Sequence, residues 1–162
     1  MSEILRVEFG AGGTITPGWR SHDIEVPIDR PLPYEDGTVH EIKAEHVVEH
    51  VSPAAALGFF DECLRILVPG GKLRISVPSI TQILTRSMDD DGARLAHARD
   101  IVVGHGHQAV YDHAVLMALL RIAGFPQIYA VPRDLTLDGH WHVIGLAKDE
   151  LETIRVEARK AS

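Results

Sequence analysis

Residues 4–13 read ILRVEFGAGG, the most informative segment of the chain for its fold class. Residues 4–9 alternate between apolar and charged side chains well enough to predict a strand. The glycine run at residues 10–13 follows without a break, which predicts a tight turn. Such a turn lets a nucleotide-like ligand approach the backbone closely, because a side chain there would collide with it. The alternative is a turn that serves only the path of the chain.

The next part of the chain predicts strands and helices in alternation. Pro17-Gly18 interrupts the few residues before a strand expected around residues 22–26, so a full crossover helix does not fit there. Residues 27–37 predict a loop, and a short strand is expected at 41–44. Ser52-Pro53 predicts the start of a helix that ends at 69–71, and a strand follows at 72–77. These units are typical of a parallel sheet with helices on its faces.

The second half of the chain continues the pattern. Helices are predicted over residues 80–88, 93–103 and 112–123, with a solvated break at 89–92 and a loop at 104–107. Strands are predicted at 127–131 and 141–147. Residues 153–158 alternate again and form either an added edge strand or the true last strand, and the sequence leaves both open.

Length, charge and composition limit the classes of function. The 162 residues predict a single domain over residues 1–162. The net charge of −7 and the scattered Lys and Arg residues argue against a nucleic-acid partner. No uncharged apolar stretch approaches the roughly 20 residues that span a bilayer, and the first residues do not resemble a signal peptide. We therefore expect a cytoplasmic protein without a membrane partner. The oligomeric state is not set by the sequence.

Asp23 is the acidic residue that we expect to close the second strand, where a carboxylate can accept both hydroxyls of a ribose. The alternative is a solvated loop carboxylate. A dinucleotide fingerprint needs G-x-G-x-x-G at the start of a helix, with the acid about 20 residues further on. Here the third glycine directly follows the second, and Asp23 lies only ten residues past Gly13. The spacing disfavours a nucleotide-dependent oxidoreductase and favours a ligand that has a ribose but no pyrophosphate.

Several segments together resemble one family. They are FGAGG (9–13) with PGW (17–19), HDI (22–24), PLPYEDG (31–37), AEHVVEH (44–50), LVPGGKL (67–73) with VP (77–78), and AGF (123–125). In this order they resemble the small Rossmann-like S-adenosylmethionine-dependent methyltransferases, from residue 4 to about residue 130. The resemblance implies an α/β three-layer sandwich, with a mostly parallel sheet and an antiparallel last strand. It also implies S-adenosylmethionine as the cofactor.

The resemblance also implies which residues bind the cofactor: Gly10, Ala11, Gly12, Asp23, Ile24, Asp29, Glu45 and His46. The glycine turn would run under the methionine part, and Asp23 would hold the ribose. Glu45 and His46 would face the methionine end and the sulfonium. Many relatives have an Asp that reads the adenine amino group at the position of Pro27, and Asp29 is the residue expected to substitute for it.

The acceptor side is expected at the loop and helix start around residues 105–112, which in similar proteins borders the acceptor. A histidine there could take a proton from the acceptor during methyl transfer. We expect His107, His50 and Tyr111 to be the catalytic residues, and His46 to complete the acceptor pocket with them. The alternative is a helix cap and a solvated loop without a chemical role.

Histidine pairs in the sequence also raise the question of a metal. His46 with His50, His105 with His107, and His140 with His142 could supply nitrogen ligands. Several of these residues belong to the motifs of the resemblance, and no cysteine assists them. Cys63, the single cysteine, falls inside a helical apolar pattern and is expected to be a buried small hydrophobe. We therefore expect no metal site.

The function expected from the sequence is methyl transfer from S-adenosylmethionine to a small-molecule or glycan-type acceptor that the sequence does not identify. The alternative is a non-catalytic methyltransferase-like binding module that keeps the fold. Two features favour this alternative: Pro27 at the adenine-reading position, and a chain that starts at the first strand, without the N-terminal helices that often close over the pocket.

Overall fold

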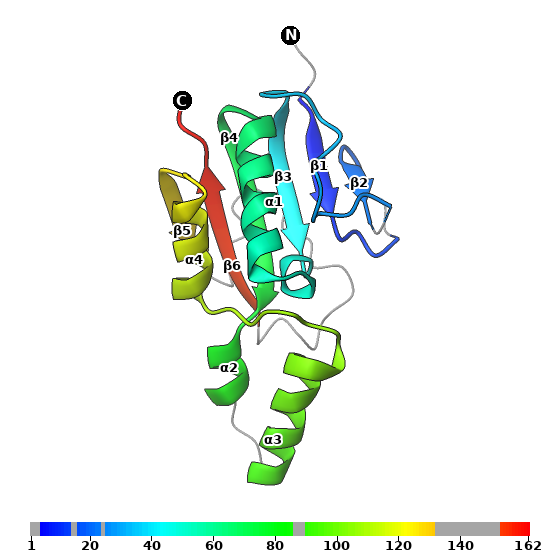
Figure 1. Ribbon diagram of the computed structural model, residues 1–162, viewed down its shortest axis with the longest axis vertical. Helices are drawn as coiled ribbons and strands as arrows, with labels where there is room; N and C mark the ends of the chain where they lie inside the picture. The colour runs from blue at the N-terminus through cyan, green and yellow to red at the C-terminus, as the bar shows by residue number, and fades with distance from the viewer. Residues whose placement is uncertain (1–3, 14–15, 24, 86–89, 132–152) are drawn as a thin grey trace.

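Figure 1 shows the computed structural model, which describes residues 4–13, 16–23, 25–85, 90–131 and 153–162. The described residues form a sheet of six strands in the order β2-β1-β3-β4-β6-β5. The strands are β1 (Arg6–Phe9), β2 (Arg20–His22), β3 (Val39–Glu45), β4 (Leu67–Pro78), β5 (Gln127–Ala130) and β6 (Thr153–Arg159). β2, β1, β3 and β4 run parallel to one another, whereas β6 is antiparallel to both β4 and β5. The predicted fold class, a mostly parallel sheet with an antiparallel last strand, is confirmed.

The described helices and helical turns are the 3₁₀ turn η1 (Val48–His50), α1 (Pro53–Ile66), α2 (Ile80–Thr85), α3 (Asp91–Arg99), the π-helical turn η2 (Asp100–Gly104) and α4 (His113–Ile122). Three of these helices, α1, α3 and α4, begin directly after a residue whose side chain caps them. Ser52 caps α1 by accepting a hydrogen bond from the Ala55 N–H, and Asp112 caps α4 in the same way through Val115. In Figure 1, α1 and α4 cover one face of the sheet, while α2 and α3 project beyond the ends of the strands.

The face of the sheet under α1 and α4 carries the apolar core. Alternate strand residues such as Val7, Ile42, Ile75 and Val156 are fully buried there. Phe59, Phe60, Cys63 and Ile66 of α1 belong to the same cluster, with Leu116 and Leu120 of α4. Burial raises the pKa of the Cys63 thiol, which suits the structural role predicted for it.

The opposite face of the sheet is charged, although it is also buried. Glu8, Lys43, Arg74 and Glu157 are each at most 2% exposed. The Lys43 ammonium lies 2.7 Å from Glu8 Oε2, and Arg74 Nε donates to Glu157 Oε2 at 3.2 Å. Buried charges need such partners, because an unpaired one would cost several kcal/mol. In a strand of alternating pattern, one face is therefore apolar and the other ionic.

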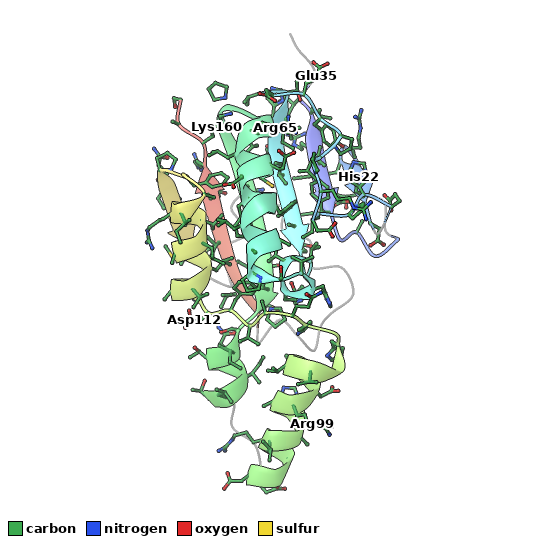
Figure 2. All side chains as sticks on the ribbon, in the orientation of Figure 1. His22, Glu35, Arg65, Arg99, Asp112 and Lys160 are labelled. Carbon is green, nitrogen blue, oxygen red and sulfur yellow. The ribbon has the colours of Figure 1, made fainter. Side chains whose placement is uncertain are left out.

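Arg65 of α1 fixes the loop that joins β2 to β3. Its guanidinium donates to Glu62, to the Asp36 carboxylate and to the carbonyl oxygens of Leu32 and Tyr34. Figure 2 places Arg65 beside Glu35, at the same end of the sheet as the N-terminal ends of β1 and β3. These contacts hold the part of the loop that leads into β3 against α1.

Several boundaries differ from the sequence predictions, and one point that the sequence left open is decided. α1 ends at Ile66 and β4 begins at Leu67, so residues 69–71, where the helix was expected to end, belong to the strand. β2 ends at His22 instead of continuing to residue 26, because the Val26 N–H donates to the Asp23 carbonyl and closes a turn. α3 begins at Asp91, inside the predicted break, because Asp90 is its N-cap. β6 lies between β4 and β5, so the tail forms the true last strand and not an added edge. The strand predicted at 141–147 lies outside the described residues.

Within the described parts of the chain, no helix has both the length and the apolar character that crossing a membrane requires.

Candidate functional site

A pocket of about 610 Å³ lies at the carboxyl ends of β1 and β3. The strand order reverses between these two strands, because β2 lies on one side of β1 and β3 on the other. Open α/β sheets bind ligands at such a switch point, and the volume falls within the range of about 300–1,000 Å³ of small-molecule sites. The walls come from the glycine turn, from residues 23–29, from residues 46–51 and from Gln108.

Gly10 holds the floor of the pocket close to the end of β3. Its φ is +77°, and an added Cβ would collide with the Val47 Cγ2 methyl and lie 2.7 Å from the Glu45 carbonyl oxygen. The N–H groups of Gly10 and Ala11 both donate to the His22 carbonyl, at 3.0 and 3.3 Å. Gly10 and Gly12 line the pocket, whereas Ala11 is buried beside it. The turn therefore packs closely against the end of β3 at Gly10, whereas Gly12 has no neighbour within 4 Å of an added Cβ.

Asp23 and Asp29 are the acidic residues of the pocket wall. The Asp23 N–H donates to Glu25 Oε1 at 2.9 Å, which helps to hold Asp23 directly after β2. Asp29 is exposed, and its carboxylate lies 3.7 Å from Arg30 Nε. Between the two acids the wall is apolar, with Val26, Pro27 and Ile28. Ile24, which the resemblance also implicates, lies outside the described residues.

His46 follows β3 with an unusual backbone. Among the described residues it is the one non-glycine residue with a positive φ, at +52°. Its N–H donates to the Ser76 carbonyl at 2.9 Å, and its Nε2 lies 3.3 Å from Thr153 Oγ1. Such strained residues cluster at functional sites, and His46 lines the pocket.

Glu45 is placed differently from the expectation. Strand alternation puts it on the charged face of the sheet with Lys43, and it is not among the lining residues of the pocket. Burial raises the pKa of its carboxyl group, and the nearby Lys43 ammonium opposes this shift only in part. The carboxylate therefore does not face the space where the methionine end of a cofactor was expected.

His50 lines the other end of the pocket, and His107 packs against it from outside the lining. Their ring centroids lie 4.7 Å apart at an interplanar angle of 72°. The N–H groups of Gln108 and Ala109 donate to the Glu49 carbonyl at 2.7 and 3.2 Å, and the Gln108 side chain donates to the His50 carbonyl at 2.7 Å. These bonds hold two distant segments together. Burial lowers the pKa of His107. The nearby Glu49 carboxylate acts to raise this pKa, whereas the neighbouring His50 and His105 lower it further.

Tyr111 does not line the pocket, contrary to the expectation. It is 1% exposed, and its hydroxyl points at the Val48 carbonyl oxygen, 3.5 Å away. Burial, with a contribution from Glu49, raises the pKa of the phenol to about 12. Tyr111 therefore supports η1 from the core side. Of the residues predicted for the acceptor pocket, His46 and His50 line it, whereas His107 contacts His50 without lining the pocket itself.

Glu49 and Gln108 are the site residues that sequence reasoning missed. Glu49 is buried, with its carboxylate beside His46 and close to His50 and His107. The sequence does carry one signal for it, an acid between His46 and His50 in a short helical turn. Gln108 shows no such signal, because its role depends on backbone pairing with η1.

Known proteins resemble this chain in structure and not in sequence. No protein-family model matches the chain, and no curated protein matches its sequence. Among solved structures, the CurJ carbon methyltransferase superposes with a TM-score of 0.61 at 15% identity, over 98% of this chain and 49% of that chain. An S-adenosylmethionine-dependent methyltransferase from Mesorhizobium loti gives 0.61 at 13% identity, over 99% and 94%.

A third solved structure is phosphoethanolamine N-methyltransferase 2 of Haemonchus contortus, in complex with S-adenosyl-L-methionine. It gives a TM-score of 0.54 at 11% identity, over 100% of this chain and 50% of that chain. The present chain thus spans about half the length of two of these three proteins. At such identities the likeness establishes architecture. The chain has the fold of the Rossmann-like S-adenosylmethionine-dependent methyltransferases.

Proposed function

We propose that this chain binds S-adenosylmethionine in the switch-point pocket and transfers its methyl group to a small-molecule or glycan-type acceptor. The observation that carries the proposal is the convergence of Gly10, Asp23, Asp29 and His46 on one pocket. These residues come from three separate segments, and the pocket lies where ligands bind in open α/β sheets. The methyltransferase fold supports the choice of cofactor.

The cofactor placement follows from the chemistry of the walls. The Asp23 carboxylate can accept both ribose hydroxyls, since an ionised carboxylate has lone pairs for two donors. The apolar wall of Val26 and Ile28 suits the face of an adenine, with Asp29 at its edge to accept from the amino group. The methionine part then lies over Gly10 and Gly12. Because Glu45 faces away, the backbone of the turn and His46 are left to hold this end.

The transferring methyl group would point towards His50 and His107. In the reaction the acceptor oxygen or nitrogen attacks the methyl carbon, the carbon–sulfur bond breaks, and S-adenosylhomocysteine leaves as a neutral thioether. The acceptor also loses a proton, which an imidazole of this pair can take. We assign the base role to His107, with His50 beside it. Tyr111 is left out because it is buried in the core.

Calorimetric titration with S-adenosylmethionine, S-adenosylhomocysteine and NAD in parallel tests the cofactor. We expect both sulfur compounds to bind and NAD not to bind. Asp23→Ala should weaken S-adenosylhomocysteine binding by about 1.5–3 kcal/mol, which is about 10- to 150-fold, because hydrogen bonds to a charged group are lost. Asp61→Ala on the exposed side of α1 is the matched control and should bind like the parent protein. Equal affinity in the Asp23 variant, or binding of NAD alone, would contradict the placement.

The binding-module alternative predicts the same affinities without turnover. Release of S-adenosylhomocysteine in the presence of fractionated small metabolites distinguishes the two. Under our proposal a fraction that supports release should lose this effect in His107→Ala, while cofactor affinity stays unchanged.

A further inference from the structure

A second feature of the pocket end is a set of three potential ligands. Glu49, His50 and His107 each offer one ligand atom, and these atoms all lie within 4.8 Å of one another. Two imidazole nitrogens with one carboxylate oxygen form the donor set that binds zinc in several hydrolases and iron(II) in many oxygenases. The sequence predicted no metal, because several of the histidines belong to the motifs of the resemblance and no cysteine assists them. Glu49 was not among the ligands considered there.

Glu49 is the observation that points to a bound cation. Its side chain is 2% exposed, and within the described parts of the chain neither carboxylate oxygen accepts a hydrogen bond. Among the residues that the structure describes, its ion-pair partner is His46, whose Nδ1 lies 3.3 Å from Oε1. A buried carboxylate is costly unless charge and hydrogen bonds compensate it on both oxygens. The Oε2 side is therefore left for a further positive group.

The backbone holds the three ligands in place. The hydrogen bonds from residues 108 and 109 to the Glu49 carbonyl fix the His107 segment against η1. Two nitrogen ligands of a tetrahedral zinc ion lie about 3.4 Å apart, given zinc–nitrogen bonds of about 2.0–2.1 Å. The three ligand atoms already lie within 4.8 Å of one another, and His50 is exposed, so only a small further approach separates them from zinc geometry.

The surroundings leave an open coordination position. His50 lines the pocket, so a metal held beside it would face the pocket space. Three protein ligands and one open position are typical of catalytic and not of structural zinc sites. His46 contacts both Glu49 and Thr153, so it can orient the carboxylate without being a ligand itself.

We propose that Glu49, His50 and His107 bind a divalent first-row transition metal ion, with Zn²⁺ as the reference ion, at the acceptor end of the pocket. Two imidazoles favour such an ion over Mg²⁺, which prefers oxygen ligands. The site does not depend on cofactor binding. In the metal-bound form His107 is a ligand and cannot serve as the base, and the metal would itself acidify a bound acceptor hydroxyl.

Metal titration of protein purified without a His tag and stripped with a chelator tests the proposal. Co²⁺ is the probe, because its visible absorption reports coordination, and Zn²⁺ calorimetry gives the affinity. We expect one ion per chain. His50→Ala and His107→Ala should each weaken binding roughly tenfold or more, since even the loss of an outer-shell partner costs 10- to 100-fold. Both side chains are at least partly exposed, so these variants should fold.

Two controls make the result specific. His97→Ala removes a histidine of α3 and should leave the affinity unchanged, and so should the double variant His140→Ala with His142→Ala. The proposal is overturned if the parent protein binds no metal, if His50→Ala and His107→Ala bind like the parent, or if affinity is lost in the double variant. Titration of S-adenosylhomocysteine is read separately, so failure of the cofactor proposal leaves the metal result interpretable.

Discussion

Gly10→Ala is the substitution whose effect can be worked out most fully from the structure. A φ of +77° costs a residue with a Cβ about 1–2 kcal/mol. The new methyl group would also collide with Val47 Cγ2 and lie 2.7 Å from the Glu45 carbonyl oxygen. That oxygen belongs to the backbone of β3 and cannot turn aside, so overpacking adds about 1–3 kcal/mol. We expect a total destabilisation of about 2–5 kcal/mol.

Gly37→Ala is the matched control for this effect. Gly37 also has a positive φ, +64°, but an added Cβ there meets nothing within 4 Å. Its substitution should cost only the backbone term, about 1–2 kcal/mol. Urea unfolding of both variants measures the difference, and calorimetry in native buffer should show that Gly10→Ala also loses S-adenosylhomocysteine binding. Equal destabilisation by the two substitutions would refute the close-packing argument.

Three further outcomes are expected. Lys43→Met should lower the free energy of unfolding by about 3–5 kcal/mol, because it leaves the Glu8 carboxylate buried without its charge partner; a loss below 1 kcal/mol in urea unfolding would contradict this. Burial acts to raise the pKa of Glu8, but hydrogen bonds, chiefly from Lys43, outweigh it and lower the pKa below 4.5. The stability from this lowered pKa is therefore fully present above about pH 4.5 and is lost as pH falls through the folded pKa. In Glu8→Gln, the free energy of unfolding should depend less on pH in this acidic range. Tyr111→Phe removes one hydrogen bond at 3.5 Å, so it should change stability by no more than about 1 kcal/mol and leave turnover intact; a hundredfold loss of turnover would return Tyr111 to the catalytic residues.

Local patterns were enough to predict much of the fold. The alternation before Gly10 gave a strand, and the glycine turn after it needs positive φ angles that glycine adopts without strain. Ser52 and Asp112 marked helix starts because a capping side chain bonds to an N–H only three residues away. The position of Asp23 at the pocket followed in the same way, since it comes directly after a strand next to the glycine turn.

The tertiary structure decided the rest, because the deciding contacts join residues far apart in the chain. Alternating side chains in β1, β3, β4 and β6 predict a sheet with two different faces. Only the pairing of the strands brings Glu8 to Lys43 and Arg74 to Glu157, which makes one buried face ionic. Likewise, Glu49 becomes a potential metal ligand only when backbone hydrogen bonds bring the His107 segment against η1. A sequence pattern predicts on which side of its own strand or helix a side chain lies. The partner that it meets is set by packing across the sheet and around its ends.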